Sequence, residues 1–245
     1  MKRALIVGGS SGIGLSMAVT LAGREEVSKV YIVDKAPFPQ SYLNGKIDYY
    51  HFDLTQSDYS LFDTFTDIDT LIVTAGFGRL ALFKDIDEAL ISAYFNVNTI
   101  SAIRLIKRFY HKLAGKEDFY CCVMVSIAGF MSSPFFSVYG ATKAALKIFI
   151  ESVNVELEKA GSKNRILNVS PGSIKGTSFN NGATDLSQLQ SLANAILSEM
   201  QQKSDLFIPQ YDEVYKEVLE RYHEDFRKEG LHSYDYKQKS GRVTK

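Results

Sequence analysis

Apolar runs bounded by turn residues recur along the chain, with longer amphipathic segments between them. Several runs are apolar throughout rather than alternating, which is typical of strands buried on both faces of a parallel sheet. We predict strands at 4–9, 29–34, 47–54, 69–76, 119–127 and 165–172, and a shorter one at 205–210. Helices are predicted at 12–23, 56–66, 85–113, 136–160 and 185–202. This alternation predicts an α/β fold with right-handed crossovers and a doubly wound parallel sheet that carries helices on both faces.

The region after residue 210 departs from this alternation. The stretch 211–230 predicts one more helix, ending at Gly230, with aromatic side chains at helical spacings. We expect this stripe to be core or a subunit interface rather than a substrate site. Residues 231–245 are polar and basic and are expected to be disordered or to act as an arm. Because no repeat or linker-like stretch interrupts the chain, residues 1–245 are predicted to form one domain.

Composition excludes several classes of function. The 28 acidic and 28 basic residues balance, so no strong field suggests nucleic acid or a membrane surface as a partner. No apolar run reaches the roughly 18–20 residues that span a bilayer, and the N-terminus lacks a signal peptide's apolar segment. The adjacent Cys121 and Cys122 are expected to be buried strand residues in a reducing cytoplasm. The four histidines show no metal-ligand spacing, so no metal site is predicted.

A glycine loop, "VGGSSGIG", follows the first predicted strand and precedes a predicted helix. Glycine lets the backbone turn tightly and approach a pyrophosphate, whose charge is favoured by the helix N-terminus. The pattern therefore predicts a dinucleotide site, and a merely tight strand–helix turn is the alternative. The predicted contacts in this loop are Gly8, Ser10, Ser11, Gly12, Ile13 and Gly14.

Two aspartates close the second and third predicted strands. Asp34 would accept hydrogen bonds from the adenosine ribose hydroxyls and would repel a 2′-phosphate, so we expect NAD rather than NADP. Lys35 is the one residue that argues for NADP, and a solvated turn aspartate remains the alternative for Asp34. Asp53 and Leu54 are expected at the adenine edge.

Tyr139 and Lys143 stand four positions apart in the stretch "VYGATKAAL", which reads as helix. Residues at i and i+4 share one helix face, so the ammonium would lie beside the phenol. A free phenol titrates near pH 10, and a nearby cation stabilises the phenolate and lowers its pKa. We therefore expect Lys143 to lower the pKa of Tyr139, although such a pair could be accidental.

Further motifs accompany this pair in a fixed order: "TAG" at 74–76, "NVN" at 96–98, "VSIAG" at 125–129, "YGATK" at 139–143 and "SPG" at 170–172. Together with the glycine loop, this set resembles the short-chain dehydrogenase/reductase family over roughly residues 4 to 177. The interval of 13 residues between Ser126 and Tyr139 also fits the family. The resemblance implies a single Rossmann-type domain, a nicotinamide cofactor and interconversion of an alcohol and a carbonyl.

The resemblance also implies roles for individual residues. Tyr139 would be the general acid in carbonyl reduction and the base in the reverse direction. Lys143 would tune Tyr139 and hold the nicotinamide ribose, and Ser126 would orient the substrate oxygen. Asn98, preferred over its neighbour Asn96, would support a water in a proton relay. The cofactor contacts implied outside the glycine loop and the two aspartates are Ala75, Gly76, Asn98, Tyr139, Lys143, Pro171, Gly172, Ile174 and Thr177.

Three residues depart from the family pattern. Val7 stands where many relatives have Thr, and Thr74 replaces the asparagine of "NAG", so its hydroxyl must supply an amide's hydrogen bonds. Thr177 lies six residues after Pro171, one further than usual, which weakens its expected contact with the cofactor. Neither the change at Val7 nor the change at Thr74 touches the proposed proton path.

Substrate specificity is expected in two segments. One is the loop between Ser126 and Tyr139, which carries Phe130, Met131, Phe135 and Phe136, and the other is a lid over 173–190. The apolar side chains either meet a carbonyl on a partly hydrophobic molecule or pack beneath the loop. The resemblance further implies a homodimer or homotetramer with the helices at 85–113 and 136–160 at an interface. A non-catalytic dinucleotide-binding redox sensor is the alternative function, and NADPH the alternative cofactor.

Overall fold

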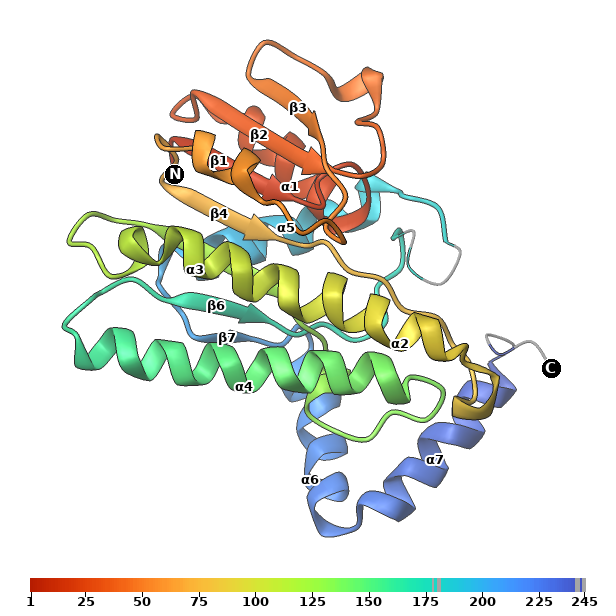
Figure 1. The fold of residues 1–245 in the computed structure, drawn as a ribbon. Helices are drawn as coiled ribbons and strands as arrows, with labels where there is room; N and C mark the ends of the chain where they lie inside the picture. The colour runs from red at the N-terminus through yellow and green to blue at the C-terminus, as the bar shows by residue number, and fades with distance from the viewer. Residues whose placement is uncertain (178, 180–181, 241–242, 244–245) are drawn as a thin grey trace.

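A seven-stranded, wholly parallel sheet forms the centre of the computed structural model, which describes residues 1–177, 179, 182–240 and 243 (Figure 1). Its strand order is β3-β2-β1-β4-β5-β6-β7, so the order reverses beside β1. This arrangement confirms the predicted Rossmann-type, doubly wound sheet. The strands are β1 (Arg3–Val7), β2 (Lys29–Asp34), β3 (Ile47–His51), β4 (Thr70–Val73), β5 (Tyr120–Met124), β6 (Ile166–Val169) and β7 (Leu206–Phe207).

Helices cover both faces of the sheet because its central strands are apolar on both sides. Leu5 and Leu71 point to the face covered by α3 (Ser101–Leu113) and α4 (Ser137–Lys159). Ile6 and Ile32 point to the other face, which α1 (Gly12–Ala22) and α5 (Leu186–Gln201) cover. Cys121 and Cys122 point to opposite faces of β5, and both are buried and free, as predicted.

The predicted helix at 85–113 is observed as α2 (Glu88–Phe95), a π-helical turn (Asn96–Ile100) and α3, without interruption. Asp87 caps α2 by accepting a hydrogen bond from the backbone of Ala89. The helix Glu88–Leu113 is long and apolar enough to cross a membrane by length and composition alone, but α3 packs on the sheet as a core helix. The π turn places Asn98 on the buried side, and such turns are frequent at functional sites.

The predicted helix at 56–66 is wrong, because this segment holds only a short 3₁₀ helix, Ser60–Thr64. Tyr59, Phe62 and Phe65 recur at intervals of three, which suits a 3₁₀ turn, and all three are buried against the sheet. Further 3₁₀ turns lie at Gln40–Tyr42, Phe83–Asp85 and Ile127–Gly129.

The C-terminal region also differs from its prediction. After the two-residue β7, a π turn (Tyr211–Tyr215) leads into α6 (Lys216–Glu224), and α7 (Phe226–Lys239) follows. The two helices form a V that projects below α4 in Figure 1. The prediction of one helix ending at Gly230 is wrong, because the helix is interrupted at Asp225. This residue caps α7 by accepting hydrogen bonds from the backbone N–H groups of Arg227 and Lys228.

The expected disorder after residue 230 is wrong as far as residue 239, because α7 continues through it. Gly230 is buried inside α7, where an added Cβ would lie 3.3 Å from Oγ of Ser132. This glycine thus permits close approach of the helix to a loop rather than ending the helix. Residues 241–242 and 244–245 of the predicted tail lie outside the described residues.

Candidate active site

A cleft of about 1750 Å³ runs along the carboxyl ends of the strands. The glycine loop after β1, Asp34 at the end of β2 and Ser126 after β5 line it, as does Pro171 after β6. Ligands of open α/β sheets bind at this edge, where the strand order reverses. The cleft therefore brings together the predicted glycine loop, Ser126 and Tyr139.

The glycine loop forms a cradle that side chains would fill. Gly8 and Gly12 have φ of +94° and +53°, values that other residues rarely adopt. An added Cβ at Gly8 would lie 2.7 Å from Cα of Ala75, and one at Gly14 would collide with the carbonyl oxygen of Gly8. Thr74 donates a hydrogen bond from Oγ1 to that same oxygen at 2.9 Å, so its hydroxyl ties the loop to β4. The cradle fits a pyrophosphate that approaches the backbone at the N-terminus of α1.

The predicted lid lies against this cradle. The backbone N–H of Gly12 donates a hydrogen bond to Oγ1 of Thr184 at 3.0 Å. Thr177 also faces Gly12, and its own hydroxyl donates to the carbonyl oxygen of Ile174 at 3.1 Å. Thr177 and Ile174 both line the cleft despite the altered spacing after Pro171. Of the predicted lid, positions 178 and 180–181 lie outside the described residues.

Asp34 is held by two backbone donors at the end of β2. Its oxygens accept hydrogen bonds from the N–H of Ser10 and of Ala36, both at 2.9 Å. Ser10 lies behind the loop, with its hydroxyl bonded to the carbonyl oxygen of Ala36, and does not line the cleft.

Lys35 pairs with Asp53 at 2.7 Å, and this contact, with hydrogen bonds from Thr55, lowers the pKa of Asp53 to about 2. The cation that argued for NADP is therefore bound to a carboxylate.

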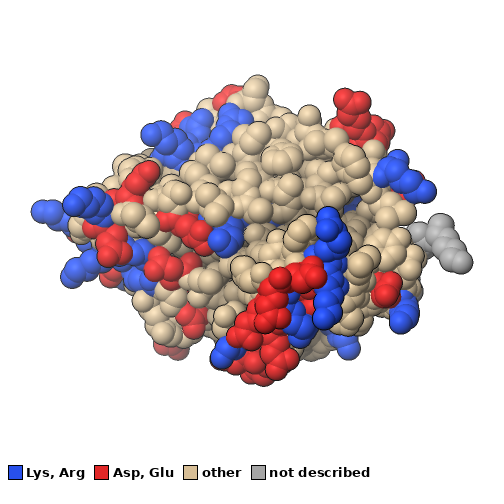
Figure 2. All heavy atoms as spheres, turned by 90° about the horizontal axis from the view of Figure 1, so that it is seen from below, with Lys and Arg blue, Asp and Glu red and all other residues tan. Residues whose placement is uncertain are grey.

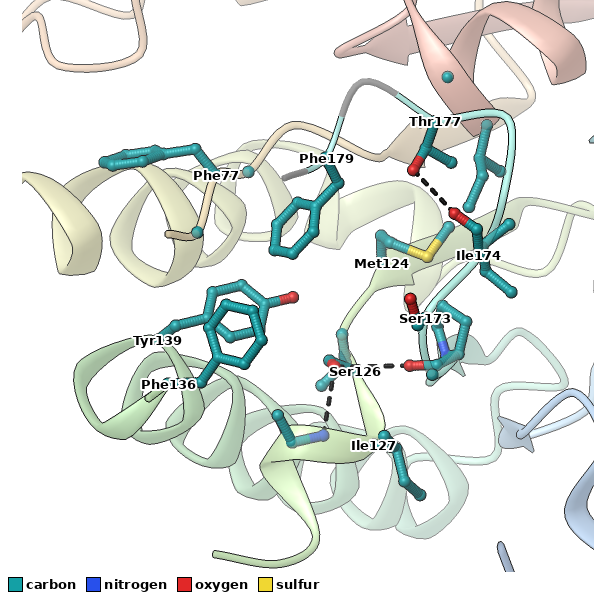
Figure 3. A pocket seen from close by; sticks show the side chains of 18 of the residues that line it. Phe77, Met124, Ser126, Ile127, Phe136, Tyr139, Ser173, Ile174, Thr177 and Phe179 are labelled. Atoms are coloured by element: carbon teal, nitrogen blue, oxygen red, sulfur yellow. Dashed lines mark hydrogen bonds between the residues drawn. The ribbon is translucent and has the colours of Figure 1, made fainter. Parts of the chain in front are cut away.

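Ser126 and Tyr139 face the same space, as Figure 3 shows. Ser126 follows β5, and its Oγ accepts from the N–H of Ala128 at 3.2 Å and donates to the carbonyl oxygen of Pro171 at 3.4 Å. Tyr139 comes from the first turn of α4, which brings its hydroxyl toward Ser126. Two hydroxyl groups from separate elements thus meet in one cleft.

The expectation that Lys143 lowers the pKa of Tyr139 is wrong in this structure. Burial raises the pKa of Tyr139 to about 12, and the hydrogen bond with Ser126 opposes this only in part. Lys143 does lie on the same side of α4, with Nζ 5.7 Å from the phenol ring centroid, but it donates to the carbonyl oxygen of Met124 at 2.8 Å. Burial lowers the pKa of Lys143 to about 7. Desolvation therefore sets the direction of the pKa shift for both groups.

Asn98 and Lys143 lie beneath the floor of the cleft rather than in its lining. Oδ1 of Asn98 accepts from the N–H of Phe77 at 2.9 Å, and its Nδ2 donates to the carbonyl oxygen of Phe77 at 2.9 Å. An added Cβ at Gly76 would lie 3.2 Å from Oδ1 of Asn98 and 3.4 Å from Nζ of Lys143. Asn98 therefore fixes the strand-end loop directly above Lys143.

Aromatic rings surround the phenol of Tyr139. The ring centroids of Phe136 and Phe179 lie 5.2 and 5.4 Å from that of Tyr139. An added Cβ at Gly78 would lie 2.8 Å from Cδ2 of Tyr139 and 2.7 Å from Cζ of Phe179, so this glycine leaves room for both of these rings. Sequence reasoning missed Phe77, Gly78 and Phe179 as lining residues, although Phe77 and Gly78 directly follow the recognised "TAG".

The aromatic substrate loop divides between the two roles left open for it. Met131 and Phe136 line the cleft. Phe130 instead packs in a small apolar cluster with Tyr215. Phe135 stacks on Tyr234 of α7, with the two ring centroids 4.6 Å apart. Both interpretations therefore hold, each for different side chains.

The C-terminal helices form the outer wall of the cleft, a role that the sequence did not favour. Tyr215 packs on the domain core beside Ile127 and also lines the cleft, whereas Tyr211 is exposed. The expectation of core packing is thus correct for part of the stripe. The lining residues from this region are Val214, Tyr215, Val218, Arg221, Glu229, His232, Ser233, Tyr236 and Lys237.

Comparison with known proteins agrees with this architecture. The family model described as short chain dehydrogenase matches residues 2–187. Dehydrogenase RED2 of Cochliobolus heterostrophus is 31% identical over 169 residues, which cover 66% of this chain and 63% of that protein. The match thus spans less than two thirds of that relative.

Among the described residues no group of three or more His, Cys, Asp or Glu could hold a metal ion.

Two solved structures share the fold. A short chain dehydrogenase/reductase from Burkholderia phymatum, in complex with NAD, superposes with a TM-score of 0.77 at 17% identity, covering 92% of this chain and 94% of that one. The bulky-bulky ketone specific alcohol dehydrogenase from Comamonas testosteroni gives a TM-score of 0.71 at 26% identity, covering 95% and 94%. The likeness extends over nearly the whole of both chains.

Proposed function

The chain belongs to the short-chain dehydrogenase family, and from this premise we propose that it is an NAD-dependent oxidoreductase that interconverts a carbonyl group and a secondary alcohol. The observation that carries this proposal is the meeting of the Ser126 and Tyr139 hydroxyls in a cleft that continues to the glycine cradle. The solved relative from Comamonas testosteroni, described as ketone specific, supports the same class of substrate.

The chain's own residues would move the proton. In reduction, Ser126 would hydrogen-bond the carbonyl oxygen and Tyr139 would donate its phenolic proton to that oxygen. The chemistry that a bound reduced nicotinamide would supply is a hydride for the carbonyl carbon. The raised pKa of Tyr139 keeps the phenol protonated at neutral pH, so the proton that reduction requires is present. Lys143, whose pKa of about 7 permits proton exchange near neutrality, would restore it, with Asn98 holding the loop above.

The preference for NAD rests on the end of β2. The carboxylate of Asp34 faces the cleft and would repel a 2′-phosphate. Lys35 would attract that phosphate, but its ion pair with Asp53 weakens this attraction. Titration of the protein with NADH and with NADPH, followed by cofactor fluorescence, tests this preference. We expect tighter binding of NADH and a loss of that preference in Asp34→Ala, and tighter NADPH binding by the parent would contradict it.

Tyr139→Phe tests the catalytic proposal. This change removes only the proton donor, and general acid catalysis contributes about 10²–10⁴-fold, so kcat for ketone reduction should fall by at least about 100-fold. The assay follows NADH absorbance with a panel of ketones, and Tyr42→Phe, in an exposed turn remote from the cleft, serves as the matched control.

The outcomes separate the candidate functions. Equal turnover by Tyr139→Phe and the parent would remove Tyr139 from its role. Tight dinucleotide binding without turnover of any ketone or alcohol would favour the non-catalytic redox sensor instead. Retained cooperative unfolding of the variant shows that a loss of activity is not a loss of fold.

Assembly and location remain predictions. We propose a homodimer or homotetramer, which the apolar side chains exposed on one face of α4, Ile148 at 58% and Val155 at 69%, support. Light scattering at micromolar concentration tests this, and a monomer would contradict it. A cytoplasmic location stays an expectation, as does the absence of nucleic-acid and membrane partners.

A further inference from the structure

One face of α7 closes the end of the cleft beyond Tyr139. Gly230, Ser233 and Lys237 lie at i, i+3 and i+7, so they share a face of this helix. Gly230 approaches Ser132, and Lys237 contacts Ser133. The same face therefore brings an ammonium group and several serine hydroxyls to the lining of the cleft.

Lys237 is held in place by neutral oxygens. Its Nζ donates to Oγ of Ser133 at 2.7 Å and to the carbonyl oxygen of Pro134 at 2.9 Å. Among the described residues it makes no ion pair with a carboxylate. Burial lowers its pKa to about 8, so the ammonium remains the main form at neutral pH. A half-buried cation without a counter-ion favours an anionic ligand beside it.

The other charges of this part of the cleft are already paired. Glu229, nearly buried, accepts from Arg221 at 2.7 Å, and His232 lies 3.6 Å from its second oxygen. Acidic and basic side chains also adjoin one another on the outer face seen from below (Figure 2). No single-sign surface field therefore selects the ligand. Of the charged side chains that α6 and α7 bring to the cleft lining, Lys237 is the one without a carboxylate partner among the described residues.

Phe136 adjoins both this cation and Tyr139. Nζ of Lys237 lies 5.5 Å from the centroid of Phe136, whose ring lies 5.2 Å from that of Tyr139. Phe136 and Tyr236 both line the cleft, and the Phe136 ring lies next to both polar groups. A ligand that contacts both Tyr139 and Lys237 would therefore pass the Phe136 ring, which favours an apolar body between its two polar ends.

We infer that Lys237, with Ser133, binds a carboxylate of the substrate, so that the substrate is an oxo acid or hydroxy acid whose reacting carbon is separated from the acid group by an apolar body. This rests on the proposed function, because it assigns the far end of the same site. A single ammonium balances the single charge of a carboxylate, which matches this acid group better than a doubly charged phosphate ester.

The test compares acids with their neutral esters. The probes are benzoylpropanoate, benzoylpentanoate and benzoylheptanoate, each with the ketone at the phenyl end and the acid at the other, and their methyl esters. The parent should prefer at least one acid by about 10-fold or more in kcat/KM, the effect expected of a hydrogen bond to a charged group. Lys237→Met should lower the acid-to-ester ratio by about the same factor, mainly through KM, and Lys237→Arg should retain most of it.

The control is Lys239→Met, which removes an exposed lysine from the same helix and should leave the ratio unchanged. If Lys237 only fastened α7 to the loop, Lys237→Met would lower kcat/KM for acids and esters equally, which would overturn the inference. Turnover of the esters with no preference for any acid would also overturn it and leave the proposed function intact. If the parent reduced neither series, the proposed function would fail first and the inference with it.

Discussion

Replacing Lys143 by Met removes a cation that the fold keeps almost fully buried, at 3% exposure. Burial lowers the pKa of this lysine from 10.5 to about 7. At about 1.4 kcal/mol per pH unit, holding the charge inside costs the folded state on the order of 5 kcal/mol. Methionine fills a similar volume without charge, so the variant should escape this cost.

The sign of the pH dependence follows from the two pKa values. Between about pH 7 and 10.5 the unfolded chain binds a proton at Lys143 that the folded chain has released, so the stability contributed by this group rises with pH. The stability advantage of Lys143→Met is therefore largest at and below pH 7 and should fall by about 4 kcal/mol as pH approaches 10. The raised pKa of Tyr139 affects stability mainly above pH 10, which lies beyond the range of the measurement.

Urea unfolding of the parent and the variant, followed by circular dichroism from about pH 6 to 9.5, measures this difference. Contributions from other lysines are shared by both proteins and cancel. Lys159→Met, at the exposed end of α4, controls for the loss of a solvated lysine charge. A difference between parent and Lys143→Met that stays constant over this range would refute the argument from burial. The variant should also lose most of its activity, because the proposed proton path runs through Lys143.

Two further changes test contacts around the cleft. Thr184→Ala frees the N–H of Gly12 for a phosphate, so NADH should bind about 2–10-fold more tightly in a fluorescence titration, and weaker binding would show that the Thr184 hydroxyl contacts the cofactor instead. Gly172→Ala places a Cβ on the hydroxyl of Tyr215 and should lower the free energy of unfolding by about 1–3 kcal/mol. Adding Tyr215→Ala should make the double variant less destabilised than the sum of the two changes, and additive losses would contradict the clash.

The nucleotide half of the molecule could be predicted because its signals are local. A glycine with positive φ, an apolar strand and a helix start each have a recognisable sequence pattern within a few residues. Gly8, Gly12 and Asp34 lie at the positions that these patterns predict. The motif order then located Ser126 and Tyr139 without any knowledge of the contacts between strands.

Features that depend on burial or on distant contacts could not be predicted in this way. The pKa of Tyr139 depends on desolvation by Phe179, Phe136 and the surrounding loops, which pairing at i and i+4 does not reveal. Gly230 resembles a helix stop, but its function is set by Ser132, far away in the sequence. Lys237 carried no signal, because its partners Ser133 and Pro134 are about a hundred positions earlier.

The V formed by α6 and α7 joins the sheet only through its last and shortest strand, β7. Because the glycine cradle and the Ser126–Tyr139 pair are complete before that strand, the terminal helices can be exchanged without rebuilding the residues proposed to bind the cofactor and transfer the proton. Evolution or engineering could therefore change the substrate specificity by replacing one contiguous C-terminal segment. A single recombination point would suffice, and the rest of the site would stay unchanged.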